Sequence, residues 1–381
     1  MISSIEYMQH AIRLAKKGLY TTDPNPCVGC VIVKDEKIVG EGWHQRAGEG
    51  HAEINALKQA ATKAKDATVF ITLEPCSHTG KTPPCVDALI NAGVKKVIAA
   101  MTDPNPLVAG SGLKKLQDAG IETEYGLLES QARELNPGFI KRMECGRPFV
   151  RIKLAMSLDG RTAMASGESQ WISGEASRND VQRLRAQSSA ILTGIDTVLA
   201  DDPSMNVRLT AEQLNIDSVL EATVQPKRIV LDSRFRVPAD VKIAALDSEC
   251  TVYTTVNVDK NKQYPFTIET IETKDGQIDL HALMKDLAKK EINLLHVEAG
   301  SILCGALLKN ALVDEIIIYM APHIMGDNAK GLFHLPELEK MKDRVSLKVK
   351  DMRSIGDDIR IIVLPEYSVC QTQKDSGIRG Y

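Results

Sequence analysis

The sequence has no long hydrophobic run and no regular pattern of cysteines. Its longest apolar stretches, such as 314–322, are interrupted and far too short to cross a bilayer. The N-terminal stretch MISSIEYMQHAIRLAKKG also lacks the apolar block of a signal peptide. Eight unevenly spaced cysteines in 381 residues predict reduced thiols rather than a disulfide framework. We therefore expect a cytoplasmic protein that has no membrane partner.

Charge of one sign and aromatic side chains are equally scarce. The net charge is −3 with no long run of one sign, and aromatic residues make up only 4% of the chain. Both features argue against a nucleic-acid partner. No G-x-G-x-x-G motif follows a strand-like segment, so a Rossmann dinucleotide site has no local support. The remaining composition, 43% hydrophobic and 25% charged, is typical of a soluble enzyme with two domains.

The first part of the chain alternates strand-like and helix-like segments, which predicts an α/β sheet that is at least partly parallel. The pattern indicates strands at 28–33, 38–43, 67–75, 95–101 and near Ile121, with helices at 51–64, 83–91 and 111–120. An N-terminal amphipathic helix is also expected. Ser3 or Ser4 would cap it, Gly18 would stop it, and Ile5, Met8, Ile12 and Ala15 would form its apolar face.

A second α/β pattern begins after the helix-ending residues at 136–148, where we place a domain boundary. It predicts strands at 149–160, 190–194, 228–233, 250–255 and 294–300, helices at 175–187 and 279–290, and a closing hairpin at 345–364. Residues 204–226 are expected to form a long loop. The predicted domains are 1–146 and 147–366, followed by a disordered tail at 367–381.

Four residues of the first domain form a candidate catalytic zinc site. His51 opens a predicted helix, Cys76 follows a predicted strand, and Cys85 stands at the start of another helix. One imidazole and two thiolates leave one tetrahedral zinc position for water, which is typical of catalytic rather than structural sites. Glu53 is too close in sequence to His51 to bind the same ion comfortably. It is better placed beside the water, as a proton carrier.

A second cysteine pair, Cys27 and Cys30, has a spacing familiar from zinc and redox sites. The pair leads into an apolar strand, and no second pair accompanies it. We interpret both as ordinary buried or half-buried thiols, with a metal or redox role as the alternative.

The pattern H-x-E followed by P-C and a further cysteine resembles the zinc-dependent cytidine deaminase superfamily. Eight residues separate Cys76 from Cys85, where that superfamily usually has two. The riboflavin-pathway deaminases share this wide spacing, and DPNPCVGCVIV, GWHQRAGEGHAE and LEPCSHTGKTPPC are similar to their hallmark segments. The resemblance covers most of residues 20–90. It implies a cytidine-deaminase-like α/β/α fold that deaminates a phosphoribosyl diaminopyrimidine, a small-molecule substrate.

The segment between the two cysteines is a candidate phosphate-binding loop. A Walker motif is excluded because position 75 is proline instead of glycine. A turn glycine, the cation of Lys81 and several hydroxyl groups nevertheless suit a single phosphate. A solvated surface loop is the alternative. Together with the resemblance, this predicts deaminase substrate contacts from Asn25, His44, Ser77, His78, Lys81 and Thr82.

The second domain resembles the reductase half of the same riboflavin-pathway family. The similar segments are RIKLAMSLDGRTA, GESQWIS, LRAQSSAILTGIDTVLADDP and VEAGSILCGALL. The resemblance implies a dihydrofolate-reductase-like α/β domain that uses NADPH to reduce the ribosyl group to ribityl. By residue-by-residue carry-over, NADPH would contact Ala155, Trp171, Thr197, Asp201, Gly300, Ser301, Ile302, Leu303, Cys304, Gly305 and Ala306. The substrate would contact Lys153, Ser169, Arg185, Met205, Arg208 and Glu298, with Lys153 and Asp201 close to the reacting ribose.

Several alternatives stay open at this point. Trp171 could belong to the core, and Arg185 could lie on a solvated helix face. The chain could also be a nucleobase or tRNA deaminase with an accessory domain, or a non-catalytic ligand sensor. A nucleobase or tRNA deaminase should have a basic patch and aromatic stacking groups for nucleic acid, but the net charge is −3 and only 4% of the residues are aromatic. A non-catalytic sensor should lack a zinc ligand or the catalytic glutamate, but His51, Glu53, Cys76 and Cys85 are all present. The resemblance further implies one zinc ion per chain and a homo-oligomer, dimer or tetramer, formed through the reductase domain.

Overall fold

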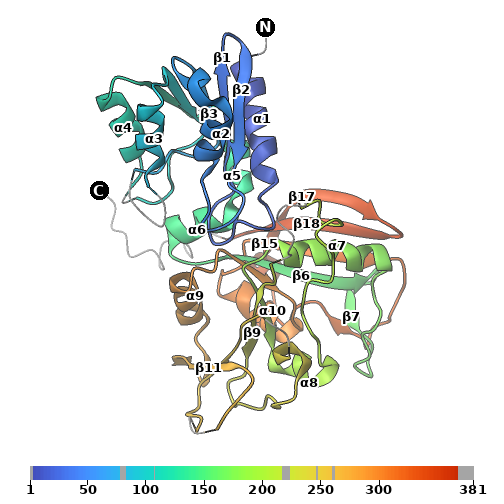
Figure 1. The fold of residues 1–381 in the computed structure, drawn as a ribbon. Coiled ribbons are helices and arrows are strands. Elements are labelled where there is room, and N and C mark those ends of the chain that lie inside the picture. The colour runs from blue at the N-terminus through green and yellow to red at the C-terminus, as the bar shows by residue number, and fades with distance from the viewer. Residues whose placement is uncertain are drawn as a thin grey trace. The chain divides into compact units, whose positions relative to one another are not determined.

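The computed structural model describes residues 3–77, 83–106, 108–216, 224–245, 248–259 and 262–367. They divide into two compact units (Figure 1). The first unit runs to Gly146 and also includes 210–216. The second runs from Arg147 to Leu209 and resumes at Gln225. Apart from Tyr367, the predicted tail lies outside the described residues. Within these ranges, none of the helices is long and apolar enough to span a membrane.

The first unit is built on a five-stranded sheet in the order β2-β1-β3-β4-β5, which is parallel from β3 to β5 and antiparallel at β1 and β2. The strands are β1 (Gly29–Lys34), β2 (Lys37–Trp43), β3 (Thr68–Ile71), β4 (Lys96–Ala99) and β5 (Glu122–Tyr125). The helices are α1 (Ser4–Lys16), α2 (Ala52–Ala60), η1 (Ala61–Ala64), α3 (Cys85–Asn91), α4 (Ser111–Asp118), α5 (Glu129–Leu135) and α6 (Pro137–Cys145).

Alternating side chains of β1 supply two separate cores. Val31 and Val33 pack with residues of α1, α5 and α6 on one face of the sheet. Cys30 and Ile32 pack with residues of α2, α3 and α4 on the other face. Because side chains of a strand point alternately to opposite faces, a buried strand of this kind supports a three-layer α/β/α unit.

Helix α1 begins at the predicted cap, where Ser3 and Glu6 form a reciprocal capping box. Its buried face differs from the prediction at Ile5, which is 48% exposed. The helix turns Tyr7, Ala11 and Leu14 toward the sheet as well as the predicted Met8, Ile12 and Ala15. The apolar face is therefore centred away from Ile5.

Close backbone contact sets the position of α2. A Cβ atom on Gly42 of β2 would lie 2.5 Å from the backbone nitrogen of Ala56 in α2. Only glycine permits this approach, so β2 and α2 lie directly against each other. The contact fixes the helix that starts immediately after His51.

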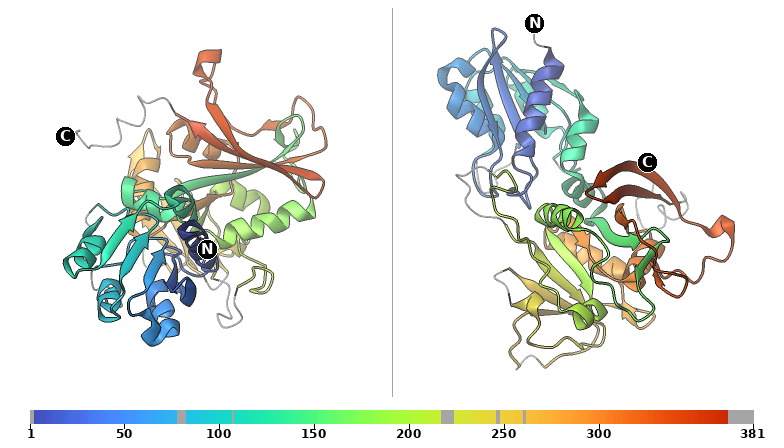
Figure 2. Two further views of the ribbon diagram at one scale, coloured as in Figure 1. Left: turned by 90° about the horizontal axis from the view of Figure 1, so that it is seen from above. Right: turned by 90° about the vertical axis from the view of Figure 1, so that its right-hand side faces the viewer.

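The second unit is built on a nine-stranded sheet in the order β11-β10-β9-β8-β14-β6-β15-β18-β17. Seven strands are parallel, and the last two form an antiparallel hairpin, drawn in red in Figure 2. Its strands are β6 (Phe149–Ser157), β8 (Ala190–Gly194), β9 (Lys227–Leu231), β10 (Cys250–Thr254), β11 (Thr267–Thr270), β14 (Leu294–Val297), β15 (Glu315–Ala321), β17 (Ser346–Ile355) and β18 (Asp358–Glu366).

Helices and short elements complete this unit. The helices are α7 (Glu175–Ala186), α8 (Ile195–Asp201), α9 (Leu280–Lys289) and α10 (Ser301–Lys309), with 3-10 turns η3 (Lys242–Ala244) and η4 (Met341–Asp343). Two small ribbons pair β7 (Arg161–Ala163) with β16 (Lys330–Gly331) and β12 (Thr273–Lys274) with β13 (Gln277–Ile278). Apolar residues of α9 and α10 cover one face of the large sheet.

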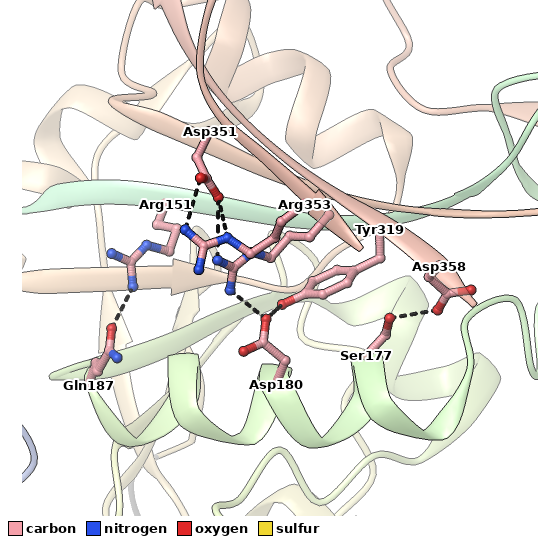
Figure 3. A network of polar contacts seen from close by, with 9 residues as sticks. Arg151, Ser177, Asp180, Gln187, Tyr319, Asp351, Arg353 and Asp358 are labelled. Carbon is pink, nitrogen blue, oxygen red and sulfur yellow. Dashed lines mark hydrogen bonds and ion pairs between the residues drawn. The ribbon is translucent and has the colours of Figure 1, made fainter. Parts of the chain in front are cut away.

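Helix α7 lies on the opposite face, where its Val181 and Leu184 pack against Ile317 and Tyr319 of β15. Polar side chains add a network of hydrogen bonds between the helix and the sheet (Figure 3). The Tyr319 hydroxyl on β15 and the Arg360 guanidinium on β18 both donate to Asp180 of α7, at 2.6 and 2.7 Å. Asp358 of β18 accepts hydrogen bonds from the Gly174 backbone and the Ser177 hydroxyl at the start of the helix. The closing hairpin thus anchors α7 at its start and its middle.

Candidate active sites

The three predicted zinc ligands meet at one point of the first unit. His51 is the N-cap residue of α2, Cys85 is the first residue of α3, and Cys76 follows β3. The Nδ1 atom of His51 lies 3.2 Å from Cys85 Sγ and 3.5 Å from Cys76 Sγ. All three ligand atoms fall within 4.8 Å of one another.

This donor set fits zinc in both chemistry and spacing. With Zn–S bonds of about 2.3 Å and Zn–N bonds of about 2.0 Å, neighbouring ligand atoms of a tetrahedral site are separated by roughly 3.5–3.8 Å. The nitrogen–sulfur separations given above are close to that range. One imidazole and two thiolates also leave one position for water, the arrangement of a catalytic site.

The surroundings of the cluster shift the pKa values of its side chains. Burial of Glu53, which is 3% exposed, raises the pKa of its carboxyl to about 7. A hydrogen bond shared with Cys85 lowers the pKa of the Cys76 thiol to about 4 and raises that of the Cys85 thiol. The cluster therefore contains a thiolate ready for a metal, and beside it a carboxyl that can exchange protons near neutral pH.

Two predicted substrate residues lie beside these ligands. The His44 ring packs edge-on against the His51 ring, with centroids 5.3 Å apart. His44 Nδ1 lies 3.2 Å from the Gly50 carbonyl, and its Nε2 lies 3.0 Å from the Asn25 amide nitrogen. The Gly50 contact requires a proton on Nδ1, so Nε2 accepts from Asn25. The fold thus brings Asn25 and His44 to the candidate zinc site.

The candidate phosphate loop is described only at its start. Ser77 Oγ lies 2.7 Å from Ser111 Oγ at the beginning of α4. The other predicted contacts, His78, Lys81 and Thr82, lie outside the described residues.

One carboxylate next to the site escaped the sequence analysis. Glu74 accepts hydrogen bonds from the backbone N–H groups of Asp103, Gly110 and Gly112, at 2.8–2.9 Å, and from that of Leu113 at 3.3 Å. It ties the segment before α4 to the strand end that carries Cys76. No local signal identifies this role, because its partners stand 29–39 residues away.

The second cysteine pair takes no part in this cluster. Cys27 and Cys30 are buried, and burial raises the pKa of both thiols, that of Cys27 to about 11. The group formed by His51, Cys76 and Cys85 is the one set of metal-ligating side chains found in the described ranges. This placement agrees with ordinary buried thiols.

A charged cluster in the second unit gathers three predicted reductase residues. Arg185 of α7 donates from Nε to Glu298 Oε1 at 2.5 Å and from its terminal nitrogen to Oε2 at 3.0 Å. Burial opposes ionisation of Glu298, but Arg185, His296 and Lys153 together outweigh it and hold the pKa of that carboxyl well below its usual range. Burial also lowers the pKa of Lys153, an effect that the nearby Glu298 partly offsets.

The two open alternatives for single residues are now decided. Arg185 is 9% exposed and forms a bidentate ion pair, so it does not lie on a solvated helix face. Trp171 is 72% exposed, with the Arg178 guanidinium 4.8 Å from its ring centroid, so it does not belong to the core.

The remaining predicted reductase residues come from several elements of the second unit. Arg208 is exposed and its backbone N–H donates to Gln182 of α7, whereas Met205 is buried in an apolar cluster with Ile191 and Val198. Asp201 is exposed and accepts a hydrogen bond from Gln170. Ala155 lies on β6, Thr197 on α8 and Ser169 in the segment after β7; all three are half-buried.

The predicted cofactor segment forms the beginning of α10. Gly300 is its N-cap residue, and Ser301–Ala306 form its first turns. Within this segment Ile302 is 66% exposed, whereas Cys304 and Gly305 are buried. A Cβ atom placed on Gly194, where α8 begins, would lie 3.7 Å from Leu303. The starts of α8 and α10 are therefore close together, beyond the ends of β8 and β14.

Comparisons with known proteins match both units. Residues 1–101 match the cytidine and deoxycytidylate deaminase zinc-binding region, and residues 148–361 match the RibD C-terminal domain. The riboflavin biosynthesis protein RibD of Escherichia coli is 53% identical over 93% of this chain and 97% of its own length. That of Haemophilus influenzae is 52% identical over 94% and 97%.

Solved structures give the same result. Acinetobacter baumannii RibD superposes with a TM-score of 0.89 at 46% identity and covers 95% of this chain and 99% of its own. A Thermotoga maritima diaminohydroxyphosphoribosylaminopyrimidine deaminase/5-amino-6-(5-phosphoribosylamino)uracil reductase superposes with a TM-score of 0.82 at 32% identity. It covers 95% of this chain and 98% of its own.

The fold and the two sites define a bifunctional enzyme that joins a zinc-dependent, cytidine-deaminase-like unit to a dihydrofolate-reductase-like unit. The predicted fold class and enzyme class are thereby confirmed. The chain belongs to the RibD family of riboflavin biosynthesis proteins.

Proposed function

We propose that the chain catalyses two successive reactions of riboflavin biosynthesis. The first converts 2,5-diamino-6-(5-phosphoribosylamino)pyrimidin-4(3H)-one to 5-amino-6-(5-phosphoribosylamino)uracil with release of ammonia. The second reduces the ribosyl group to ribityl with NADPH and gives 5-amino-6-(5-phosphoribitylamino)uracil. The observation that carries the proposal is the buried Glu53 beside the His51, Cys76 and Cys85 donor set.

The deaminase step needs a proton carrier next to an activated water molecule. Zinc, when bound by His51, Cys76 and Cys85, supplies the Lewis acid that activates the water. Glu53 accepts one proton from the attacking water and passes it to the pyrimidine ring. It then carries the second proton, from the hydroxyl group that the water has added, to the amine, which leaves as ammonia. Burial raises the pKa of this carboxyl, which favours its uptake of a proton in the first transfer.

The substrate is oriented by the residues around this carboxyl. Asn25 bonds an edge of the pyrimidine, and His44 contacts the base or the phosphate; the support is their position beside His51. Ser77, His78, Lys81 and Thr82 contact the phosphate. For the last three, the support is the sequence pattern alone.

The reductase step requires the protein to open a ribosylamine ring and to protonate the product. NADPH supplies the hydride, so the chain mainly positions and protonates. Lys153 holds a proton at Nζ close to the reacting ribose, with Asp201 as a second polar group. Arg185 and Arg208 are phosphate ligands, and Glu298, Ser169 and Met205 complete the substrate contacts. The support is the Arg185–Glu298 pair next to Lys153.

The NADPH contacts follow the resemblance. Ala155, Trp171, Thr197, Asp201 and residues 300–306 bind the cofactor. Backbone N–H groups at the start of α10 face the phosphates, because a helix N-terminus favours anions. The exposed ring of Trp171 is available for a flat cofactor group.

We further propose a cytoplasmic location and a homo-oligomer formed through the reductase unit. All seven described cysteines are free, which suits a reducing compartment. The edge strand β17 exposes Leu347, Val349 and Met352, which a second copy would cover. Light scattering of the purified protein at several concentrations checks the oligomer, and a monomer at all of them contradicts it.

The two-step proposal is tested by supplying the phosphoribosyl diaminopyrimidine with and without NADPH. Ammonia should appear in both reactions, and NADPH should be oxidised only after deamination. Oxidation of NADPH by the diamino compound itself, without ammonia release, would contradict the proposed order.

A further inference from the structure

His296 is a fully buried histidine with no role in the sequence analysis. It lies in the centre of β14, has no exposed surface, and neither ring nitrogen has a hydrogen-bond partner of regular geometry. Buried polar groups without such partners are costly, so each one calls for an explanation. Its neighbours supply one.

The register of the sheet places His296 on the face that carries the reductase cluster. His296 is paired with Arg151 on β6, and Val297 is paired with Ile152. Because side chains alternate, His296 and Glu298 share one face of the sheet, as do Arg151 and Lys153. That face is the one covered by α7, which carries Arg185.

The carboxylate of Glu298 lies beside the His296 ring. His296 Nε2 lies 3.4 Å from Glu298 Oε1, the oxygen that also accepts a hydrogen bond from Arg185 Nε. Arg185 approaches the carboxylate from α7, whereas His296 approaches it from the sheet. Arg185 and His296 therefore limit the movement of the same carboxylate from two sides, the helix and the sheet.

We propose that His296 is a positioning residue of the reductase site. Its neutral imidazole donates a hydrogen bond from Nε2 to Glu298 and thereby fixes the position of that carboxylate relative to Arg185 and Lys153. This inference rests on the proposed function and deepens it. His296 touches neither substrate nor cofactor, and it acts through Glu298.

The charged groups around the His296 ring, together with its burial, determine its protonation state. Glu298 faces it from just beyond the end of β14, Arg151 from β6 and Arg185 from α7. Lys153 lies on the same face of β6, and Glu315 of β15 is already paired with Arg151. Burial lowers the pKa of His296, and Arg151 and Arg185 add to that effect, while Glu298 opposes it. The ring is therefore neutral at pH 7. Protonation at acid pH would add a positive charge beside Arg185 and disturb the cluster.

The test compares His296→Phe with His296→Gln in the full-length, zinc-loaded enzyme. Phenylalanine fills the space and removes the donor, whereas the glutamine amide keeps a donor near the Nε2 position. Reductase kinetics are measured with preformed 5-amino-6-(5-phosphoribosylamino)uracil and NADPH, and ammonia release from the diamino substrate is measured separately. His281→Phe on α9 serves as a matched control, because α9 covers the opposite face of the sheet.

For His296→Phe we expect a loss of about tenfold or more in reductase kcat/KM, the size expected for a lost hydrogen bond to a charged group. His296→Gln should recover most of that loss at pH 7.5. It should also remove the acid decline of wild-type reductase kcat/KM. That decline should lie below the usual histidine pKa of about 6.5, because burial lowers the pKa of His296. Ammonia release should stay at the wild-type rate in both variants, and His281→Phe should match wild type throughout.

Wild-type reductase kinetics in His296→Phe would overturn the inference, as would an acid decline that His296→Gln leaves unchanged. If His296→Phe fails to fold, the pH profile of His296→Gln decides alone. Failure of the proposed function would look different, because wild-type enzyme would then not oxidise NADPH with the deaminated substrate at all.

Discussion

Two buried glutamates near the zinc ligands show how surroundings give one residue type two roles. Each oxygen of Glu74 accepts two backbone hydrogen bonds, so its lone pairs are used to hold the start of α4. Glu53 is equally buried, and burial raises its pKa to about 7. Glu74 therefore supports the structure, and Glu53 is available for proton transfer.

Replacing Glu74 by glutamine should destabilise the first unit. The amide nitrogen would face backbone N–H groups that need acceptors, and buried donors left unsatisfied cost about 1–3 kcal/mol. Thermal unfolding measures the effect. Glu122→Gln on the edge strand β5 is the matched control, because Glu122 is exposed and should change stability by less than about 0.5 kcal/mol. Equal stability of the two variants would show that Glu74 does not anchor α4.

Lys81→Ala tests the candidate phosphate loop. If Lys81 binds the substrate phosphate, the deaminase KM should rise about tenfold or more while kcat changes little, since the lost contact is remote from the reacting carbon. Steady-state ammonia release at varied substrate concentration measures both constants. Lys63→Ala, on the exposed turn η1, is the control. An unchanged KM for Lys81→Ala would show that Lys81 does not bind the substrate phosphate.

At the residue scale, the sequence predicts what is encoded locally. His51 and Cys85 stand at helix starts, where the flanking residues indicate the geometry, and the structure brings both to Cys76. The Arg185–Glu298 pair joins residues 113 positions apart, so spacing alone contains no sign of it. The sequence shows His296 as a histidine in an apolar strand, but it does not show that Arg151 and Arg185 lie near it in the fold.

At the element scale, α7 depends on a hairpin from the far end of the chain. Asp358 of β18 accepts hydrogen bonds from Gly174 and Ser177 at the start of α7, and Arg360 of β18 donates to Asp180 farther along it. Because α7 also carries Arg185, the hairpin supports the reductase cluster through this helix. Figure 3 shows its contacts with Ser177 and Asp180 of α7.

Asp358→Ala should weaken that support. It leaves a helix-terminal N–H and a buried hydroxyl without their acceptor, which should lower the free energy of unfolding by about 1–3 kcal/mol. The reductase KM should rise because Arg185 loses part of its anchorage, while ammonia release should not change. Asp357→Ala is the matched control, since Asp357 is exposed and adjacent. Denaturant unfolding and reductase kinetics measure both effects, and identical results for the two variants would contradict the account.

Elements were predicted well where periodicity is strong and less well where tertiary contacts end them. The closing hairpin and α7 were expected close to their observed positions. The strand expected at 67–75 ends at Ile71. Beyond it the pairing is irregular: the Gly29 N–H donates to the Thr72 hydroxyl, although the Thr72 N–H still donates to the Gly29 carbonyl, and the Glu74 side chain binds the start of α4. Pairing of β18 with β15 had no local signal.

At the scale of the whole molecule, the residues proposed for the two chemistries lie in different units. The candidate zinc ligands and Glu53 belong to the first unit, whereas Lys153, Arg185 and Glu298 belong to the second. Residues 210–216 group with the first unit although they lie within the sequence of the second, which no composition or periodicity indicates.

Removal of zinc should therefore separate the two activities. Dialysis against a chelator should abolish ammonia release, because the water would lose its activating cation. Reduction of supplied 5-amino-6-(5-phosphoribosylamino)uracil should continue, and added zinc should restore ammonia release. Parallel loss of both activities, with restoration of both by zinc, would contradict separate sites.

The most direct test of the account is the Glu53→Ala enzyme assayed for both reactions, with its zinc content measured. The account predicts one zinc ion per chain, no detectable ammonia release, and wild-type NADPH oxidation with supplied deaminated substrate. Ammonia release at the wild-type rate would show that Glu53 is not the proton carrier, and loss of both reactions in a folded, zinc-loaded enzyme would contradict two independent sites.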